Sequence, residues 1–203
     1  MMDAKRLLRR LILVVIVVAA LWPQVAVSQS NCPPLTRSGP LIVGVPRVTP
    51  GLGPATAGDL IVPGGVSCSL ENSQHFGNIA VQPGGTLKLV NVTVAGEVRA
   101  EGPRSTELEG SRLLGSIQVD GGGPVTVRTT DVAGSVMIDG ASGGVIVNKS
   151  TIGGALLVSN SGETVEITEN TIGGELRCEG NRGTLTVEGN SVLGDMDPAC
   201  QGG

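Results

Sequence analysis

The residues best suited to chemistry form an acidic row in the middle of the chain. Glu101, Asp120 and Asp139 follow one another at equal intervals. If that interval brings residues side by side, three carboxylates meet on one edge and repel one another. A calcium ion would relieve this repulsion, and paired carboxylates also serve polysaccharide cleavage. The row is therefore a candidate metal or catalytic site, and the alternative is a solvated acidic edge whose side chains splay apart.

Other features of the sequence weigh against an enzyme. The sequence offers no long loops to build a cleft and no aromatic platform for a sugar ring, and no basic residue recurs opposite the acidic row. Its turns do not match the GGxGxDx repeat of calcium-loaded β-rolls. We therefore expect no catalytic residue and no cofactor, and a polysaccharide-binding or polysaccharide-degrading protein stays the alternative function.

The N-terminal segment, residues 1–28, has the layout of a secretory signal peptide. Four basic residues precede an apolar run from Leu11 to Trp22, and the small residues Ala26 and Ser28 stand before Gln29. The run is short for a membrane span, which needs about 20 residues, although an uncleaved anchor is the competing interpretation. We expect cleavage after Ser28 and a secreted, periplasmic or cell-surface protein.

The composition excludes a nucleic-acid partner and points to an aliphatic core. The 203 residues include 32 glycines and 12 prolines, with no tyrosine, one tryptophan and one phenylalanine. Cleavage after Ser28 would leave ten basic and seventeen acidic residues, a net charge of about −7. A nucleic-acid binder would instead show a basic face or stacking aromatic residues.

One glycine recurs in the same context along most of the chain. The interval is constant from Gly58 to Gly134 and longer by a single residue from Gly134 onward. The extra residue falls in turn-like stretches such as DGASGG. The recurring glycines are Gly58, Gly77, Gly96, Gly115, Gly134, Gly154, Gly174 and Gly194.

Five apolar columns accompany this glycine, at positions −9, −7, −2, +2 and +4 relative to it. Within a unit they form pairs two residues apart, which is the period of a strand. A unit of about 20 residues cannot enclose a core of its own, so stacked units must bury the columns as continuous ladders. The sequence therefore predicts an all-β fold, a single-stranded parallel β-helix (β-solenoid) of about seven to eight coils, which we expect to be right-handed.

Two polar features accompany the apolar columns. His75, the only histidine, stands at position −2 of the first complete unit, where we expect a packing or capping residue. Position −4 is mostly Ser, Thr or Asn, which predicts a hydrogen-bonded ladder at a corner. A regular threonine array would suggest ice binding, but charges at Arg112 and Asp131 interrupt the neighbouring column.

The four cysteines predict two disulfides at the ends of the rod. Cys178 and Cys200 fall about one coil apart, close to the roughly 4.4–6.8 Å that a disulfide spans between Cα atoms. Cys32 and Cys68 would pair by elimination, although four cysteines permit three connectivities. The alternative is that the cysteines fill apolar columns as thiols.

Stretches such as GNIAVQPGGTLKLVNVTVAGEVRAEG and NTIGGELRCEGN resemble the repeats of small secreted bacterial proteins with a parallel β-helix fold. The segment from Cys178 to Gly203 is similar to their C-terminal cap. The resemblance covers about residues 58–203 and implies fold and export. These proteins are largely uncharacterised, so it supplies no catalytic residues.

Together these features predict three segments. Residues 1–28 are the signal peptide, residues 29–57 form a proline- and glycine-rich linker or N-terminal cap, and residues 58–203 form the repeat domain with its C-terminal cap. We expect an exported structural, adhesive or surface-associated protein. Its partner is unknown from the sequence, with an envelope or extracellular polymer as the candidate.

Overall fold

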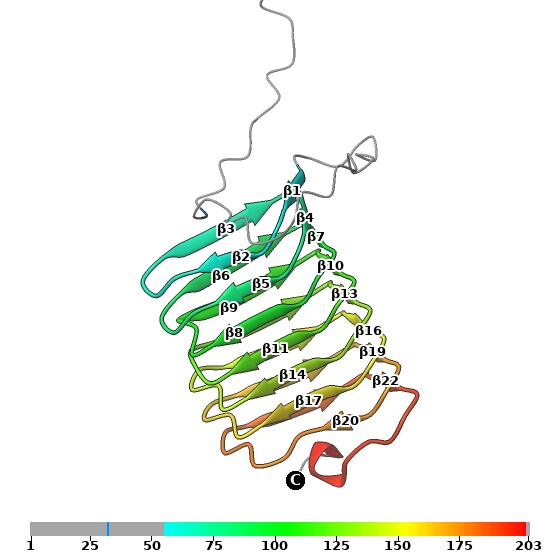
Figure 1. Cartoon of the computed structure of the whole chain (residues 1–203). Coiled ribbons are helices and arrows are strands. Elements are labelled where there is room, and N and C mark those ends of the chain that lie inside the picture. The colour runs from blue at the N-terminus through cyan, green and yellow to red at the C-terminus, as the bar shows by residue number, and fades with distance from the viewer. Residues whose placement is uncertain (1–31, 33–54, 202–203) are drawn as a thin grey trace, which may run out of the picture.

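The structure is a computed structural model that describes Cys32 and residues 55–201. The described chain winds into a rod of about seven coils, as predicted (Figure 1). Every strand pairs in parallel with the strand one coil before or after it, so each coil contributes one strand to each of three sheets. The expected signal peptide, residues 1–28, lies outside the described residues.

Sheet A has eight short strands, which flank the recurring glycines on their N-terminal side. They are β1 (Ala55–Ala57), β4 (Gln74–Phe76), β7 (Thr93–Val94), β10 (Arg112–Leu113), β13 (Asp131–Val132), β16 (Thr151–Ile152), β19 (Thr171–Ile172) and β22 (Ser191–Val192). Strand β1 lies in the expected linker or cap, and it pairs with β4.

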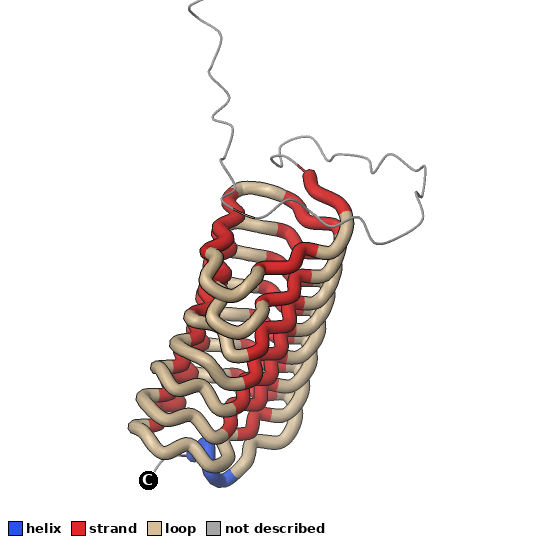
Figure 2. Tube along the Cα trace, turned by 60° about the vertical axis from the view of Figure 1, so that its left-hand side comes forward, coloured by secondary structure: helices blue, strands red, loops and turns tan. Residues whose placement is uncertain are grey.

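Sheets B and C have seven strands each. Sheet B follows the glycines and contains β2 (Leu60–Val62), β5 (Ile79–Val81), β8 (Val98–Glu101), β11 (Ile117–Asp120), β14 (Val136–Asp139), β17 (Leu156–Ser159) and β20 (Leu176–Arg177). Sheet C contains β3 (Ser67–Glu71), β6 (Thr86–Val90), β9 (Ser105–Glu109), β12 (Val125–Arg128), β15 (Val145–Asn148), β18 (Val165–Thr168) and β21 (Leu185–Glu188). A 3-10 turn, η1 (Pro198–Gln201), closes the described chain. Figure 2 shows the strands of successive coils stacked in register.

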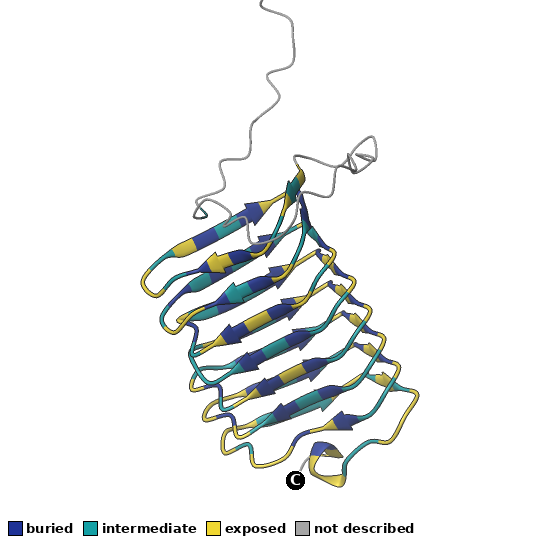
Figure 3. Cartoon of the chain, viewed as in Figure 1, coloured by how far each residue is buried: buried dark blue, intermediate teal, exposed yellow. Residues whose placement is uncertain are grey.

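The five predicted columns form the core. Nearly all of their residues are buried from the first coil to the one before last, and the alternation of buried and exposed residues is visible along the strands (Figure 3). Thr106 holds position −9 of its coil and is buried, and β9 around it pairs regularly with β6 and β12. Its buried hydroxyl has no hydrogen-bond partner among the described residues.

The recurring glycine is required by close approach of the coils. A Cβ on Gly115 would lie 2.5 Å from the carbonyl oxygen of Gly96 and 2.9 Å from the amide nitrogen of Glu97. Backbone atoms cannot yield as a flexible side chain can. Most of the recurring glycines meet the backbone one coil earlier in the same way, and the amide of Gly134 donates to Gly115 O at 3.1 Å.

At the corner between sheets C and A, a backbone conformation that is unfavourable in free energy lies beside a ladder of polar side chains. The residue at position −5 has a positive φ in all seven coils: Asn72, Asn91, Gly110, Thr129, Lys149, Glu169 and Gly189. For a residue such as Thr129, with φ at 49°, this conformation costs about 1–2 kcal/mol.

The predicted polar ladder at position −4 is confirmed at this corner. Side chains in this column accept hydrogen bonds from the backbone one coil earlier: the Ser150 amide donates to Asn170 Oδ1 and the Asn170 amide donates to Asn190 Oδ1, both at 2.9 Å. Asn170 also donates to the Val147 carbonyl oxygen at 2.8 Å. The ladder thus satisfies backbone groups that the left-handed turn takes out of the sheets.

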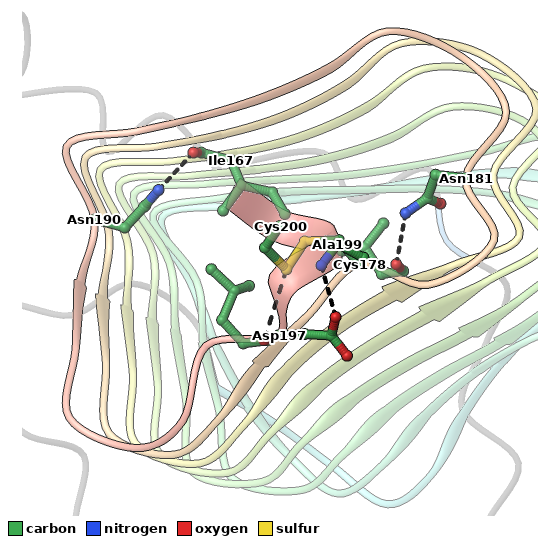
Figure 4. Close-up of a disulfide and its surroundings, with 9 residues drawn as sticks. Ile167, Cys178, Asn181, Asn190, Asp197, Ala199 and Cys200 are labelled. Carbon is green, nitrogen blue, oxygen red and sulfur yellow. Dashed lines mark hydrogen bonds between the residues drawn. A yellow bond between two sulfur atoms is a disulfide. The ribbon is translucent and has the colours of Figure 1, made fainter. Parts of the chain in front are cut away.

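Both ends of the rod carry the predicted disulfides. Cys178 and Cys200 are joined, with their Cα atoms 5.1 Å apart, and the bond holds η1 across the interior of the last coil (Figure 4). The Asp197 carboxylate accepts a hydrogen bond from the Ala199 amide at 2.7 Å and so caps η1. Cys32 is joined to Cys68 on β3 at the other end.

We predict that Gly115→Ala destabilises the rod by about 3 kcal/mol, because overpacking against backbone atoms cannot relax. The matched control is Gly144→Ala, where the nearest atom to the new Cβ is Thr164 O at 3.5 Å. Urea unfolding of both variants measures the difference. Equal effects of the two substitutions would contradict the role given to close approach.

We predict that replacing Cys178 and Cys200 together by alanine lowers the free energy of unfolding by about 3 kcal/mol, since the bond joins residues at a sequence separation of 22. Non-reducing peptide mapping of the native protein should recover the Cys178 and Cys200 peptides as one linked species. Free thiols at both positions would rule out the capping role of the bond.

Candidate functional site

The acidic row is aligned as the sequence predicted. In sheet B, Glu101 pairs in register with Asp120, and Asp120 pairs with Asp139. All three residues lie at the C-terminal ends of their strands, β8, β11 and β14, because the inward residues Ala100, Val119 and Ile138 hold the register. The carboxylates therefore sit one coil apart on the outer surface, where the sheet turns toward sheet C.

Each carboxylate of the row nevertheless has a polar partner of its own. Arg99 Nε lies 3.3 Å from Glu101 Oε1, and Gln118 Nε2 donates to Asp120 Oδ2 at 2.9 Å. In both cases the partner is two residues earlier in the same strand and therefore points outward as well. The row is thus neutralised or hydrogen-bonded strand by strand.

Asp139 receives its partners from the following coil. Ser159 Oγ and Asn160 Nδ2 both donate to Asp139 Oδ1, at 2.7 Å each. These hydrogen bonds lower the pKa of Asp139 below its usual value, first through Ser159 and then through Asn160. A carboxylate held against a second one would have its pKa raised instead. The donors from the following coil therefore outweigh the effect of burial, which would raise the pKa of Asp139.

The row also lies away from two hollows on the described surface. One hollow, of about 250 Å³, lies over sheet A beside Arg112 and Asp131. Another, of about 320 Å³, lies at the C-terminal end beside Arg177 and Met196. Neither is lined by Glu101, Asp120 or Asp139, and within the described residues no three His, Cys, Asp or Glu side chains form a group able to hold a metal ion.

His75 is a buried residue near the N-terminal end of the rod. It is 1 % exposed, and its ring lies between Thr56 on β1 and the turn that follows β4. Nε2 donates to the Asn78 carbonyl oxygen at 3.2 Å, which leaves Nδ1 as the acceptor for Thr56 Oγ1 at 3.0 Å. Burial lowers the pKa of His75 below its usual value, so the folded protein keeps the ring neutral to a lower pH than the unfolded chain does. These contacts agree with the packing and capping role predicted for His75.

A second side-chain ladder was not predicted. At position +1, just after the glycines, side-chain oxygens accept hydrogen bonds from the backbone one coil later: Asn78 N donates to Asp59 Oδ1 at 3.0 Å, and Ala155 N donates to Ser135 Oγ at 3.1 Å. The signal in the sequence was the polar or small character of this column. The alternation of inward and outward residues along a strand explains that character equally well.

These features define the class of protein: a disulfide-bonded parallel β-solenoid whose acidic row is bonded to side chains of its own chain. Comparison of the chain with family models, curated proteins and solved structures found no match in any of the three. Within the described residues, no helix has the length and apolar character that a membrane span needs.

The protonation of His75 gives a pH prediction. Because its pKa is lowered by folding, the unfolded chain binds the proton first as the pH falls below about 6.5. The contribution of the neutral ring to stability is therefore complete above pH 6.5 and decreases below it, by at most about 1.4 kcal/mol per pH unit. Urea unfolding at about pH 7.5 and about pH 5.5, on either side of this value, measures the loss.

His75→Leu is the control, since it removes the only histidine and Leu113 occupies the same column two coils later. Its stability should change much less between the two pH values. The lowered pKa of Asp139 affects stability in a separate pH range. Its pKa in the unfolded chain is 3.8, so the contribution of Asp139 to stability is complete above that pH and is lost only below it. An unchanged pH dependence in His75→Leu would assign the effect to other groups.

Proposed function

We propose that the chain is an exported, non-enzymatic structural or adhesive rod that acts at the cell surface or outside the cell. The observation that carries the proposal is the local pairing of the acidic row. Catalytic carboxylates are free to exchange protons with a substrate, whereas Asp139 accepts two hydrogen bonds from its own chain at 2.7 Å. The carboxylates of the row thus interact with groups of their own chain: Asp139 with the next coil, and Glu101 and Asp120 with residues of their own strands.

Two disulfides support the proposed location. Such bonds persist in oxidising, extracytoplasmic compartments and are rare in reducing ones. The signal peptide expected at residues 1–28 would deliver the chain there. The resemblance to small secreted bacterial β-helix proteins agrees with this location, and membership of such a group is part of the proposal.

The alternative is a protein that binds or cleaves a polysaccharide along the outer face of sheet B. The register of Glu101, Asp120 and Asp139 favours it, because a row of carboxylates one coil apart matches an extended polymer. The surface disfavours it, since Phe76 is the only phenylalanine, tyrosine or tryptophan among the described residues and the row lies outside both hollows described above.

We predict that the mature protein releases no reducing ends from acidic or neutral polysaccharides. The same preparation should sediment with insoluble envelope material in proportion to the polymer present, because an adhesive rod binds through its surface. Asp120→Asn is the matched variant and should sediment as the parent does. Release of reducing ends that Asp120→Asn abolishes would establish the enzyme instead.

A further inference from the structure

The first strand of sheet B, β2, lies at the N-terminal end of the rod, and no described strand pairs with its outer edge (Figure 1). The Leu60 amide donates to the Asn78 carbonyl oxygen at 2.9 Å, on the side of the following coil. Neighbouring residues of a parallel strand bond to opposite sides, so the amide and carbonyl groups of Ile61 point toward the end of the rod. Backbone groups of this kind are a template for another strand.

The inward side chains of β2 are nevertheless fully covered. Leu60 and Val62 are 1 % and 0 % exposed, although they belong to the first complete coil. At the other end of the rod, Leu185 and Val187 of the last coil are only half-buried. A cover on the end side of β2 is therefore required.

Strand β1 shows that the repeat starts before its first complete coil. It pairs in register with β4, with Thr56 beside His75, and so fills the sheet A place of a preceding coil. The glycine of that coil is Gly39, which precedes Gly58 by the same interval that separates Gly58 from Gly77. The sequence that begins at Gly39, GPLIV, differs from the GDLIV of residues 58–62 only in its second residue.

We propose that residues 41–43, which lie outside the described residues, dock on the outer edge of β2 as a parallel strand. In this register they lie beside Leu60, Ile61 and Val62. Leu41 and Val43 then point inward and cover the first coil, whereas Ile42 points outward, as Ile61 does at 39 % exposure. A shift by one residue would turn both inward side chains out of the core.

The length of the chain agrees with this register. From Val43 to Ala55, where β1 begins, the chain is as long as from Val62 to Gln74, where β4 begins. One circuit of the rod therefore joins the docked residues to β1. The outer edge of β2 is then occupied by the protein's own chain and does not serve another molecule as a template.

Sheet C has a different occupant at this end. Cys32 is bonded to Cys68 on β3, and its Sγ lies 3.6 Å from the carbonyl oxygen of Ser69. Pro50 and Gly51 hold the places in the preceding coil that belong to β3 in the first coil, and both residue types are unfavourable in strands. The preceding coil therefore adds a strand to sheets A and B, and Cys32 lies against sheet C.

Hydrogen exchange of the Ile61 amide, followed by NMR in the mature, oxidised protein, tests the proposal. We expect this amide to be protected, because the docked register pairs it with the carbonyl oxygen of Leu41. Val43→Asp would bury a carboxylate beside Val62 and should speed exchange of the Ile61 amide by at least about tenfold. The matched control is Ile42→Asp, which changes the outward residue of the same segment and should leave the protection intact.

The Leu156 amide, which donates to the Glu175 carbonyl oxygen at 2.9 Å, reports on the inner coils and should exchange alike in the parent and both variants. Three outcomes would overturn the proposal. A freely exchanging Ile61 amide in the parent would leave the edge unoccupied, and protection that rises with protein concentration would assign it to a second copy. Equal exchange of this amide in Val43→Asp and Ile42→Asp would exclude the register. The result is independent of the proposed function, because the docking concerns one end of the rod and not what its sides bind.

Discussion

The close approach of successive coils at the recurring glycine is the constraint on which the rest of the molecule depends. At this corner the backbone of one coil lies directly on the backbone of the previous one, so a side chain cannot stand there. The contact fixes the vertical spacing at the start of every sheet B strand. Once that spacing is fixed, the residues at +2 and +4 of successive coils are aligned. Their aliphatic side chains then fill the core without aromatic residues.

The corner between sheets C and A keeps the same spacing between coils in a different way. Between sheets C and A the chain accepts a left-handed residue in every coil, including the unfavourable Thr129, Lys149 and Glu169. The buried Ser, Thr and Asn column beside it bonds the amides that would otherwise be orphaned, as Asn170 does for Ser150. The molecule thus balances a local backbone cost against hydrogen bonds that exist only when coils are stacked. An isolated coil would have the unfavourable φ angles without those hydrogen bonds.

The sequence predicted the fold well because the fold is a one-dimensional repetition. A column such as Val98, Ile117 and Val136 needs only the period to be placed, and the structure puts all three at 0 % exposure. The prediction of the Cys178–Cys200 disulfide followed from the same counting, whereas that of Cys32–Cys68 followed by elimination. Side-chain partners did not follow from it. Arg99 and Glu101 are two residues apart in one strand, so their contact was available to sequence reasoning, but which rotamers meet depends on the surface around them. Asn160 reaches Asp139 from the next coil, across a turn whose course the repeat does not determine.

The corner between sheets B and C differs from the glycine corner in that its length varies from coil to coil. The shorter and the longer coils stack there without loss of register: Val125 pairs with Val145 although the turn before Val145 is one residue longer. The number of residues at this corner can therefore change while the stacking of the coils is kept. Longer segments grafted into successive coils here would project from one side of the rod in a line, spaced by about 4.8 Å, the separation of neighbouring strands. Such a rod could therefore display a row of unrelated peptides at a fixed spacing while its core stays the same.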